Sequence, residues 1–148
     1  MAKNTFAGYL RQCGSGKSLT GATPAPLVAS LTVTGIDATQ ASADTGAVLP
    51  KGARVLDVLT NGKGTGGSTP TMDIGTSGND DAFVAEGDID GGLKSAVAAG
   101  VAGSEVLNAT ALAADTAVYA GKGASAATGG TFDFTILFTM EDDGSLND

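Results

Sequence analysis

The chain has 148 residues, of which 42% are apolar and 5% aromatic, and this length suits one domain rather than two. A single cysteine, Cys13, excludes an internal disulfide framework, and the absence of histidine excludes Ser-His-Asp and Cys-His catalysis together with the usual zinc sites. The net charge of −8 and the 23 glycines favour an acidic protein of short strands and turns, with a thin core that neighbouring subunits would help to stabilise.

Residues 1–26 are predicted to form an extended N-terminal arm. This segment carries three bases and no acid, a charge of +3, whereas the rest of the chain carries five bases and sixteen acids, a charge of −11. Glycines and prolines after Cys13 interrupt regular structure. We therefore expect the basic arm to dock on an acidic surface, belonging either to the same chain or to a neighbour. The acidic remainder argues against a nucleic-acid partner, because phosphate contact needs clusters of Lys and Arg.

Neither a secretion signal nor a membrane span is expected. Residues 1–26 lack the apolar stretch of a signal peptide, and no apolar run approaches the length that crosses a bilayer. These features predict a protein that is made in a reducing cytoplasm and either stays there or is assembled into a particle.

The first half of the body is predicted to contain three strands. Residues 27–34 alternate, with apolar side chains at the odd-numbered positions, and the small, polar residues 35–46 are expected to form a loop. Residues 53–60 are rich in β-forming side chains. The Asn-Gly sequence and further glycines of residues 61–68 then predict a hairpin connection to a strand at residues 71–74.

The second half contains an ambiguous stretch. Residues 75–92 form a Gly- and Asp-rich segment around a short apolar patch. Residues 93–101 are Ala-rich and allow one helical turn or two, although the surrounding glycines disfavour a stable helix. Short strands are predicted at Val106-Leu107 and at residues 117–120, and a Gly- and Ala-rich loop follows.

Residues 132–140 are predicted to be the main core strand. The even-numbered positions are all apolar, the odd-numbered positions are polar except for Leu137, and the segment holds three of the five Phe in a chain without Trp. Strands at these spacings predict an all-β fold, an antiparallel two-sheet sandwich or a barrel. The chain then divides into the arm at 1–26, a body at 27–140 and an acidic tail at 141–148.

Three stretches suggest chemistry, and for each a structural explanation is preferred. Residues 14–18 resemble the end of a phosphate-binding loop but lack its upstream glycine, preceding strand and following helix. Six carboxylates at residues 73–90 offer oxygen ligands for Ca²⁺, yet the spacing of an EF-hand loop is missing, so solvated turn carboxylates are favoured. Asp57 and Asp133 lie within strands, but nothing brings them together as a glycosidase pair. We predict no catalytic, cofactor or metal residues and no enzyme activity.

Three segments of the body form a recognisable succession. They are Leu49-Pro50-Lys51-Gly52-Ala53-Arg54-Val55, then Gly66-Gly67-Ser68-Thr69-Pro70-Thr71-Met72-Asp73-Ile74-Gly75-Thr76, and finally Asp81-Ala82-Phe83-Val84. This succession resembles a group of small tailed-phage virion proteins, and the resemblance covers residues 27–140 in outline. The group is often encoded beside the major capsid protein and is similar to capsid decoration or cement proteins.

The resemblance implies a jelly-roll-like β-sandwich that sits on the outside of a phage capsid as a homo-oligomer and braces neighbouring capsid subunits. Its partners would be the major capsid protein and copies of itself, and its location the virion, after synthesis in the host cytoplasm. The resemblance supplies no active-site residues and no cofactor. Within the arm, we expect capsid contacts at Phe6, Tyr9, Leu10, Arg11 and Lys17.

The alternative function is a tail or head-fibre domain that binds a host-surface glycan or protein. Loops carried on a β-sandwich support such binding, and residues 61–92 offer a long Gly- and Asp-rich candidate. The number of copies per particle separates the two hypotheses, because a shell protein is present many times and a fibre protein only a few.

Overall fold

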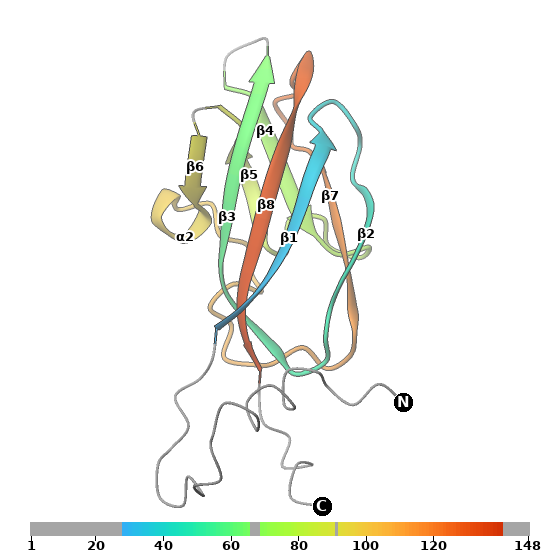
Figure 1. Cartoon of the computed structure of the whole chain (residues 1–148), viewed down its shortest axis with the longest axis vertical. Helices are drawn as coiled ribbons and strands as arrows, with labels where there is room; N and C mark the ends of the chain where they lie inside the picture. Colours follow the sequence, from blue (N-terminus) through green and yellow to red (C-terminus); the bar gives the residue numbers. More distant parts are fainter. Residues whose placement is uncertain (1–27, 66–68, 91, 141–148) are drawn as a thin grey trace, which may run out of the picture.

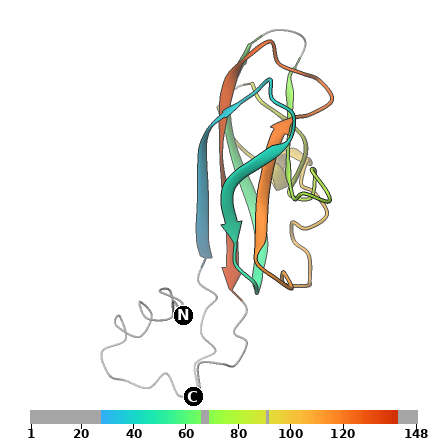
Figure 2. The same ribbon diagram turned by 90° about the vertical axis from the view of Figure 1, so that its right-hand side faces the viewer.

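The computed structural model describes residues 28–65, 69–90 and 92–140, which form eight strands and one short helix. The strands build two antiparallel four-stranded sheets, in the orders β1-β8-β3-β6 and β2-β7-β4-β5. Figures 1 and 2 show these sheets as two layers packed face to face. The elements are β1 (Val28–Asp37), β2 (Ala43–Leu49), β3 (Ala53–Thr65), β4 (Thr71–Gly75), β5 (Val84–Asp88), β6 (Gly92–Ser95), α2 (Ala96–Ala99), β7 (Thr116–Lys122) and β8 (Gly129–Met140).

The order of the strands is that of a chain folded in half and then rolled up. β1 pairs with β8, β2 with β7, β3 with β6 and β4 with β5, so the doubled ribbon reverses between β4 and β5. The pairings of β3 with β8 and of β4 with β7 then join this ribbon into two sheets. This arrangement is a jelly roll, which buries one face of each sheet against the other. The predicted all-β, antiparallel, jelly-roll-like sandwich is confirmed, whereas the predicted arm at 1–26 lies outside the described residues.

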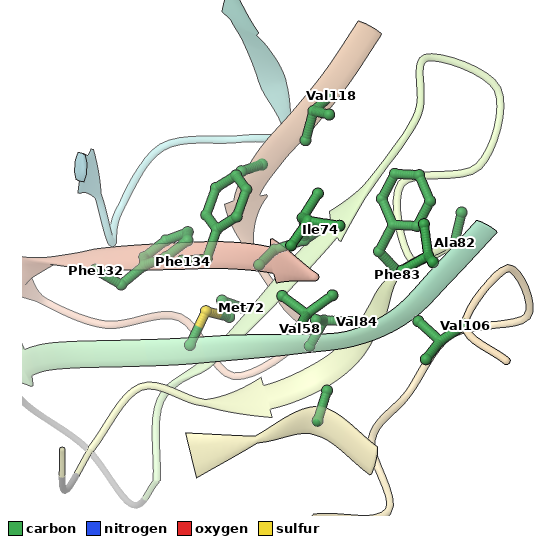
Figure 3. Packing of buried hydrophobic residues seen from close by; sticks show 14 of the residues in the cluster. Val58, Met72, Ile74, Ala82, Phe83, Val84, Val106, Val118, Phe132 and Phe134 are labelled. Carbon is green, nitrogen blue, oxygen red and sulfur yellow. The ribbon is translucent and has the colours of Figure 1, made fainter. Parts of the chain in front are cut away.

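β8 is the central strand that the alternating pattern predicted. It pairs with β1 on one side and with β3 on the other. Phe132, Phe134, Ile136 and Phe138 are buried, and Met140 packs against the edge of the core. Figure 3 shows Phe134 and Val58 from one sheet pointing toward Ile74 and Val118 of the other. The core also matches the thin one expected from composition, because Ala and Val make up half or more of its buried apolar residues.

Leu137 interrupts the polar face of β8, and β3 is irregular beside it. Phe138 pairs with Val55 and Leu137 pairs with Asp57, so Leu56 is an extra residue that forms a β-bulge. Leu56 and Leu137 are both half-buried, which explains how a leucine is tolerated outside the main core.

The loop predicted at residues 35–46 is mostly strand. β1 continues to Asp37 and β2 begins at Ala43, so this prediction was wrong. β2 is an edge strand of small residues that pairs with β7 alone, so its sequence lacks the apolar alternation of a buried strand.

The hairpin predicted at residues 61–68 is also absent, because β3 and β4 belong to different sheets. β3 runs on to Thr65, and Gly62 lies inside it rather than in a turn. A Cβ atom on Gly62 would come within 2.7 Å of the side chain of Ile89 and would overlap the Ile89 backbone. The glycine is therefore explained by close packing and not by a reversal of the chain.

In the second half, one helical turn forms and one predicted strand does not. α2 begins after Ser95, whose hydroxyl accepts a hydrogen bond from Ala98 N–H, and it ends at Gly100 in the left-handed region. β5 and β6 occupy stretches for which no strand was predicted. Val106 makes only an isolated bridge to Val55 and is not part of a strand, whereas the strand predicted at residues 117–120 is confirmed within β7.

β1 begins and β8 ends at the same end of the sandwich, because Val28 pairs with Thr139 (Figure 1). The basic segment that precedes Val28 and the acidic tail that follows Met140 are therefore attached side by side. No helix among the described residues is long and apolar enough to cross a membrane.

Candidate interaction surfaces

The capsid contacts predicted from sequence, Phe6, Tyr9, Leu10, Arg11 and Lys17, lie outside the described residues. The same holds for Cys13 and for the stretch at 14–18 that resembles a phosphate-binding loop. The surfaces described below therefore belong to the sandwich body. The first was not singled out from the sequence, whereas the second contains the six carboxylates of residues 73–90 that were.

The first surface is the outer face, by which we mean the side of the β1-β8-β3-β6 sheet that points away from the other sheet. Hydroxyl side chains run across it, and those of Thr32 and Thr135 are hydrogen-bonded at 2.9 Å between neighbouring strands. Leucines and charged residues of both signs complete it. The outer face comprises Val28, Ser30, Thr32 and Asp37 of β1, Thr131, Asp133, Thr135, Leu137 and Thr139 of β8, Arg54, Asp57, Leu59, Asn61 and Lys63 of β3, and Leu93 and Ser95 of β6.

Exposed apolar side chains lie at both margins of the outer face. Leu93 of β6 is 70% exposed and Val28 of β1 is 55% exposed. Val97 of α2 is also exposed, close in sequence to Leu93. Sequence reasoning missed Leu93 because it falls in the Gly- and Ala-rich stretch, although an isolated leucine after two glycines is a usable signal for an exposed position.

Asp57, which was considered as one half of a catalytic pair, instead holds β6 and α2 against β3. Its carboxylate accepts hydrogen bonds from Ser95 Oγ at 2.5 Å and from Val97 N–H at 3.1 Å. Asp133 accepts a hydrogen bond from Gly35 N–H at 2.7 Å. The strand register places these two carboxylates four residues apart along the sheet, about 13 Å, which exceeds the separation of either glycosidase geometry.

The second surface is acidic and belongs mainly to the other sheet. The six carboxylates of residues 73–90 lie on β4, on β5 and in the loops that adjoin them. They are Asp73, Asp80, Asp81, Glu86, Asp88 and Asp90.

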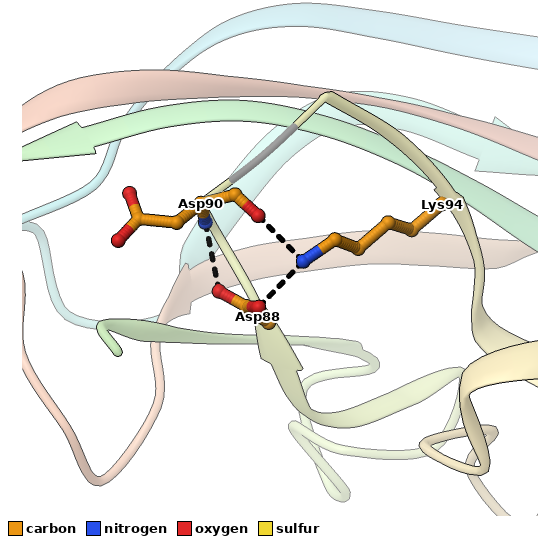
Figure 4. A network of polar contacts seen from close by, with 3 residues as sticks. All are labelled: Asp88, Asp90 and Lys94. Carbon is orange, nitrogen blue, oxygen red and sulfur yellow. Dashed lines mark hydrogen bonds and ion pairs between the residues drawn. The ribbon is translucent and has the colours of Figure 1, made fainter. Parts of the chain in front are cut away.

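Lys94 binds two residues at the end of this acidic stretch (Figure 4). Its Nζ donates to Asp88 Oδ2 and to the backbone oxygen of Asp90, both at 2.5 Å, while Asp90 N–H donates to Asp88 Oδ1 at 2.8 Å. The hydrogen bond from Lys94 holds the pKa of Asp88 below its usual value. This contact links β5 to β6 and thus one sheet to the other.

Glu86 and Asp73 tie β4, β5 and the following loop together. Glu86 accepts hydrogen bonds from Thr71 Oγ1 at 2.5 Å and from Ala124 N–H at 2.9 Å, and its own N–H donates to Asp73 Oδ1 at 2.8 Å. Burial raises the pKa of Asp73, and the neighbouring carboxylates of Glu86 and two further aspartates act in the same direction.

The carboxylates of Asp73, Glu86 and Asp88 accept hydrogen bonds from the surrounding chain. Within the ranges that the structure describes, no group of three or more Cys, Asp or Glu side chains is arranged to hold a metal ion. The acidic stretch therefore contributes cross-links between strands and a negative surface.

Neither a family model nor a curated protein sequence matches the chain. Among solved structures, a chain described as "Cyanophage Pam1 capsid asymmetric unit" is similar, with a TM-score of 0.51 and 18% sequence identity. The match covers 86% of this chain and 99% of that chain. At this identity the match shows a shared fold and no more. The coverage means that the fold is shared over nearly the whole of the matched chain.

Proposed function

We propose that this protein is a structural component of a phage virion, which binds the outside of the capsid and stabilises the shell by bridging neighbouring capsid subunits. The observation that carries the proposal is the shared fold with a chain of a cyanophage capsid, which matches over 99% of its length. The resemblance of several body segments to tailed-phage decoration or cement proteins points to the same class. In this proposal the partners are the major capsid protein and further copies of the chain.

The contrast between the two faces of the body supports a docking role. The charges of the outer face nearly cancel, since it carries the acids Asp37, Asp57 and Asp133 and the bases Arg54 and Lys63. Exposed Val28 and Leu93 flank this face, whereas the carboxylates of residues 73–90 gather on the other sheet. A face of nearly balanced charge with apolar margins suits contact with the shell, and the acidic face suits solvent. The proposed role is structural and involves no catalysis.

The basic segment 1–26 is the second proposed contact. Its charge of +3 contrasts with the −11 of the remaining chain, and the body presents its point of attachment at Val28. Electrostatic attraction to an acidic part of the shell would favour association, and many copies around one particle would gain avidity from repetition.

The test is binding of the full-length protein to phage capsids prepared without it. We expect it to cosediment with the capsids in copy numbers comparable with those of the capsid subunits, and to raise the temperature at which the shells open. The triple variant Lys3→Gln, Arg11→Gln, Lys17→Gln is expected to bind with lower occupancy and with weaker salt dependence.

A matched pair of double variants provides the control. Lys51→Gln, Lys122→Gln removes two charges from exposed positions of the body away from the outer face, and it should retain the occupancy of the wild type. Lys3→Gln, Lys17→Gln removes the same charge from the basic segment and should lower the occupancy. Equal losses in both double variants would contradict the role given to the basic segment. No binding to shells, or only a few copies per particle, would contradict the proposed function and favour the tail or fibre alternative.

A further inference from the structure

The two sheets have four edge strands, and three of them are short, interrupted or covered within the described part of the chain. β6 has only four residues. β2 loses its register with β7 between Asp44 and Val48. β5 is flanked by a later segment, because Ala85 N–H donates a hydrogen bond to the backbone oxygen of Val101 at 2.9 Å.

β1 is the exception. It is regular from Val28 to Val33, and among the described residues it pairs with β8 alone. Every second residue of such a strand directs its N–H and C=O groups away from its neighbour, toward the free side. Proteins usually protect long edges with Lys, Pro or a bulge. β1 has a bulge only after Val33, before its pairing resumes at Ile36, and no charged residue or proline occurs from Val28 to Ile36. This edge is therefore suited to pairing with another strand.

The inward-facing side chains of β1 indicate that this side of the sandwich is incompletely closed. Ala29, Leu31 and Val33 pack against the core but are only half-buried. Fully buried apolar positions, such as those of β8, are found one strand further in. A strand added beside β1 would remove more of this apolar surface from water.

We propose that β1 pairs antiparallel with β1 of a second copy of this chain about a two-fold axis, which joins two sheets into one of eight strands. The segment is self-complementary in this arrangement, because it carries no charge that would meet its own copy. With the axis near Leu31, Ser30 lies opposite Thr32 of the second copy, and both belong to the outer face. The inference rests on β1 and does not require the proposed virion role.

The antiparallel direction also follows from charge. Each Val28 is preceded by a segment of charge +3. Parallel pairing would place two such segments side by side, whereas antiparallel pairing attaches them at opposite ends of the new interface. The basic segment itself is the competing occupant of the edge, but β1 offers it no carboxylate before Asp37, and Pro24 and Pro26 cannot donate to a β-ladder.

Charge-swapped variants test the pairing. Ser30 and Thr32 are exposed, so Ser30→Lys, Thr32→Lys and Ser30→Glu, Thr32→Glu change the edge without entering the core. The wild type is expected to sediment with twice the chain mass of 14.3 kDa. Each double variant alone should dimerise about tenfold more weakly, because like charges oppose each other, and an equimolar mixture should recover the dimer as a heterodimer.

The alternatives give different results. If the basic segment occupied the edge of β1, the double Glu variant would bind that segment more tightly. An equimolar mixture of the two double variants would then form no heterodimer. A monomeric or trimeric wild type, or a dimer insensitive to both double variants, would also overturn the inference. Circular dichroism melts of both variants confirm that they fold. A monomer that still saturates capsids would refute the β1 pairing and leave the proposed function in place.

Discussion

Phe134 lies at the centre of the core, on β8, which pairs with β1 on one side and with β3 on the other. It is 1% exposed, and its ring centroid is 6.5 Å from that of Phe132. Because so few aromatic residues fill this core, the loss of one ring leaves a space that the surrounding small side chains cannot fill.

Phe134→Ala is expected to lower the free energy of unfolding by about 3–5 kcal/mol, the usual cost of removing a fully buried ring. Urea unfolding followed by circular dichroism measures this loss. Thr131→Ala on the same strand is the control, since Thr131 is exposed and its removal should cost no more than about 0.5 kcal/mol. An unfolding midpoint of Phe134→Ala close to that of the wild type would mean that β8 is peripheral to stability.

Asp73 and Asp88 are expected to respond to pH with opposite signs. The pKa of Asp73 is raised above 3.8 in the folded protein, chiefly by burial, so its ionised form opposes folding. This penalty is complete above the folded pKa and disappears as the pH falls below 3.8. Asp73→Asn keeps an oxygen that can accept the Glu86 N–H, and it should therefore raise the melting temperature at neutral pH and have little effect in acid.

The pKa of Asp88 is lowered below 3.8, chiefly by the hydrogen bond from Lys94, so its ionised form favours folding. This stabilisation is present above 3.8 and is lost as the pH falls through the folded pKa. Asp88→Asn should lower the melting temperature at neutral pH by the equivalent of about 0.2–1 kcal/mol, since the pair is partly exposed and screened by salt. Melting curves at neutral and acidic pH check both variants, and shifts of equal sign would contradict the assignment.

At the scale of the elements, the β6–α2 segment (residues 92–100) depends on one carboxylate of β3. Asp57→Ala removes the acceptor of both Ser95 Oγ and Val97 N–H, and a lost set of such bonds costs about 1–3 kcal/mol. We expect hydrogen exchange at Val97 and Ala98 to accelerate while the amides of β8 keep their protection. Asp57→Asn retains one acceptor oxygen and should have the smaller effect. Unchanged exchange in Asp57→Ala would show that other contacts hold this segment.

The strands differ in how visible they are in the sequence. β8 was predictable because one of its faces is buried from Phe132 to Phe138, which imposes strict alternation on its side chains. β2 was not predictable, because an edge strand with Gly46 at positive φ needs few apolar residues. Its position is set by pairing with β7. The end of β3 was misread for a different reason. Asn61-Gly62 has the composition of a turn, but Gly62 is required by the backbone of Ile89, which comes from another part of the chain.

At the scale of the whole molecule, alternation tells which face of a strand is buried but not which strand lies beside it. Thr32 and Thr135 are hydrogen-bonded across 103 positions of sequence, and no local pattern records that contact. A sandwich or a barrel remained open on the residues alone, and the jelly roll came from the resemblance. Among the candidate surfaces, the basic segment was visible as charge, whereas the outer face and the edge of β1 exist only once distant strands are paired.

The shared end of β1 and β8 has a mechanical consequence. A pull applied through both flanking segments would act on Val28 and Met140 from the same side, and it would peel the two strands apart one pair at a time. A pull between this end and the opposite end of the sandwich would instead strain every pair of the ladder together. In the proposed virion role, a swelling shell that stretches the protein lengthwise would thus meet far more resistance than one that spreads its two termini.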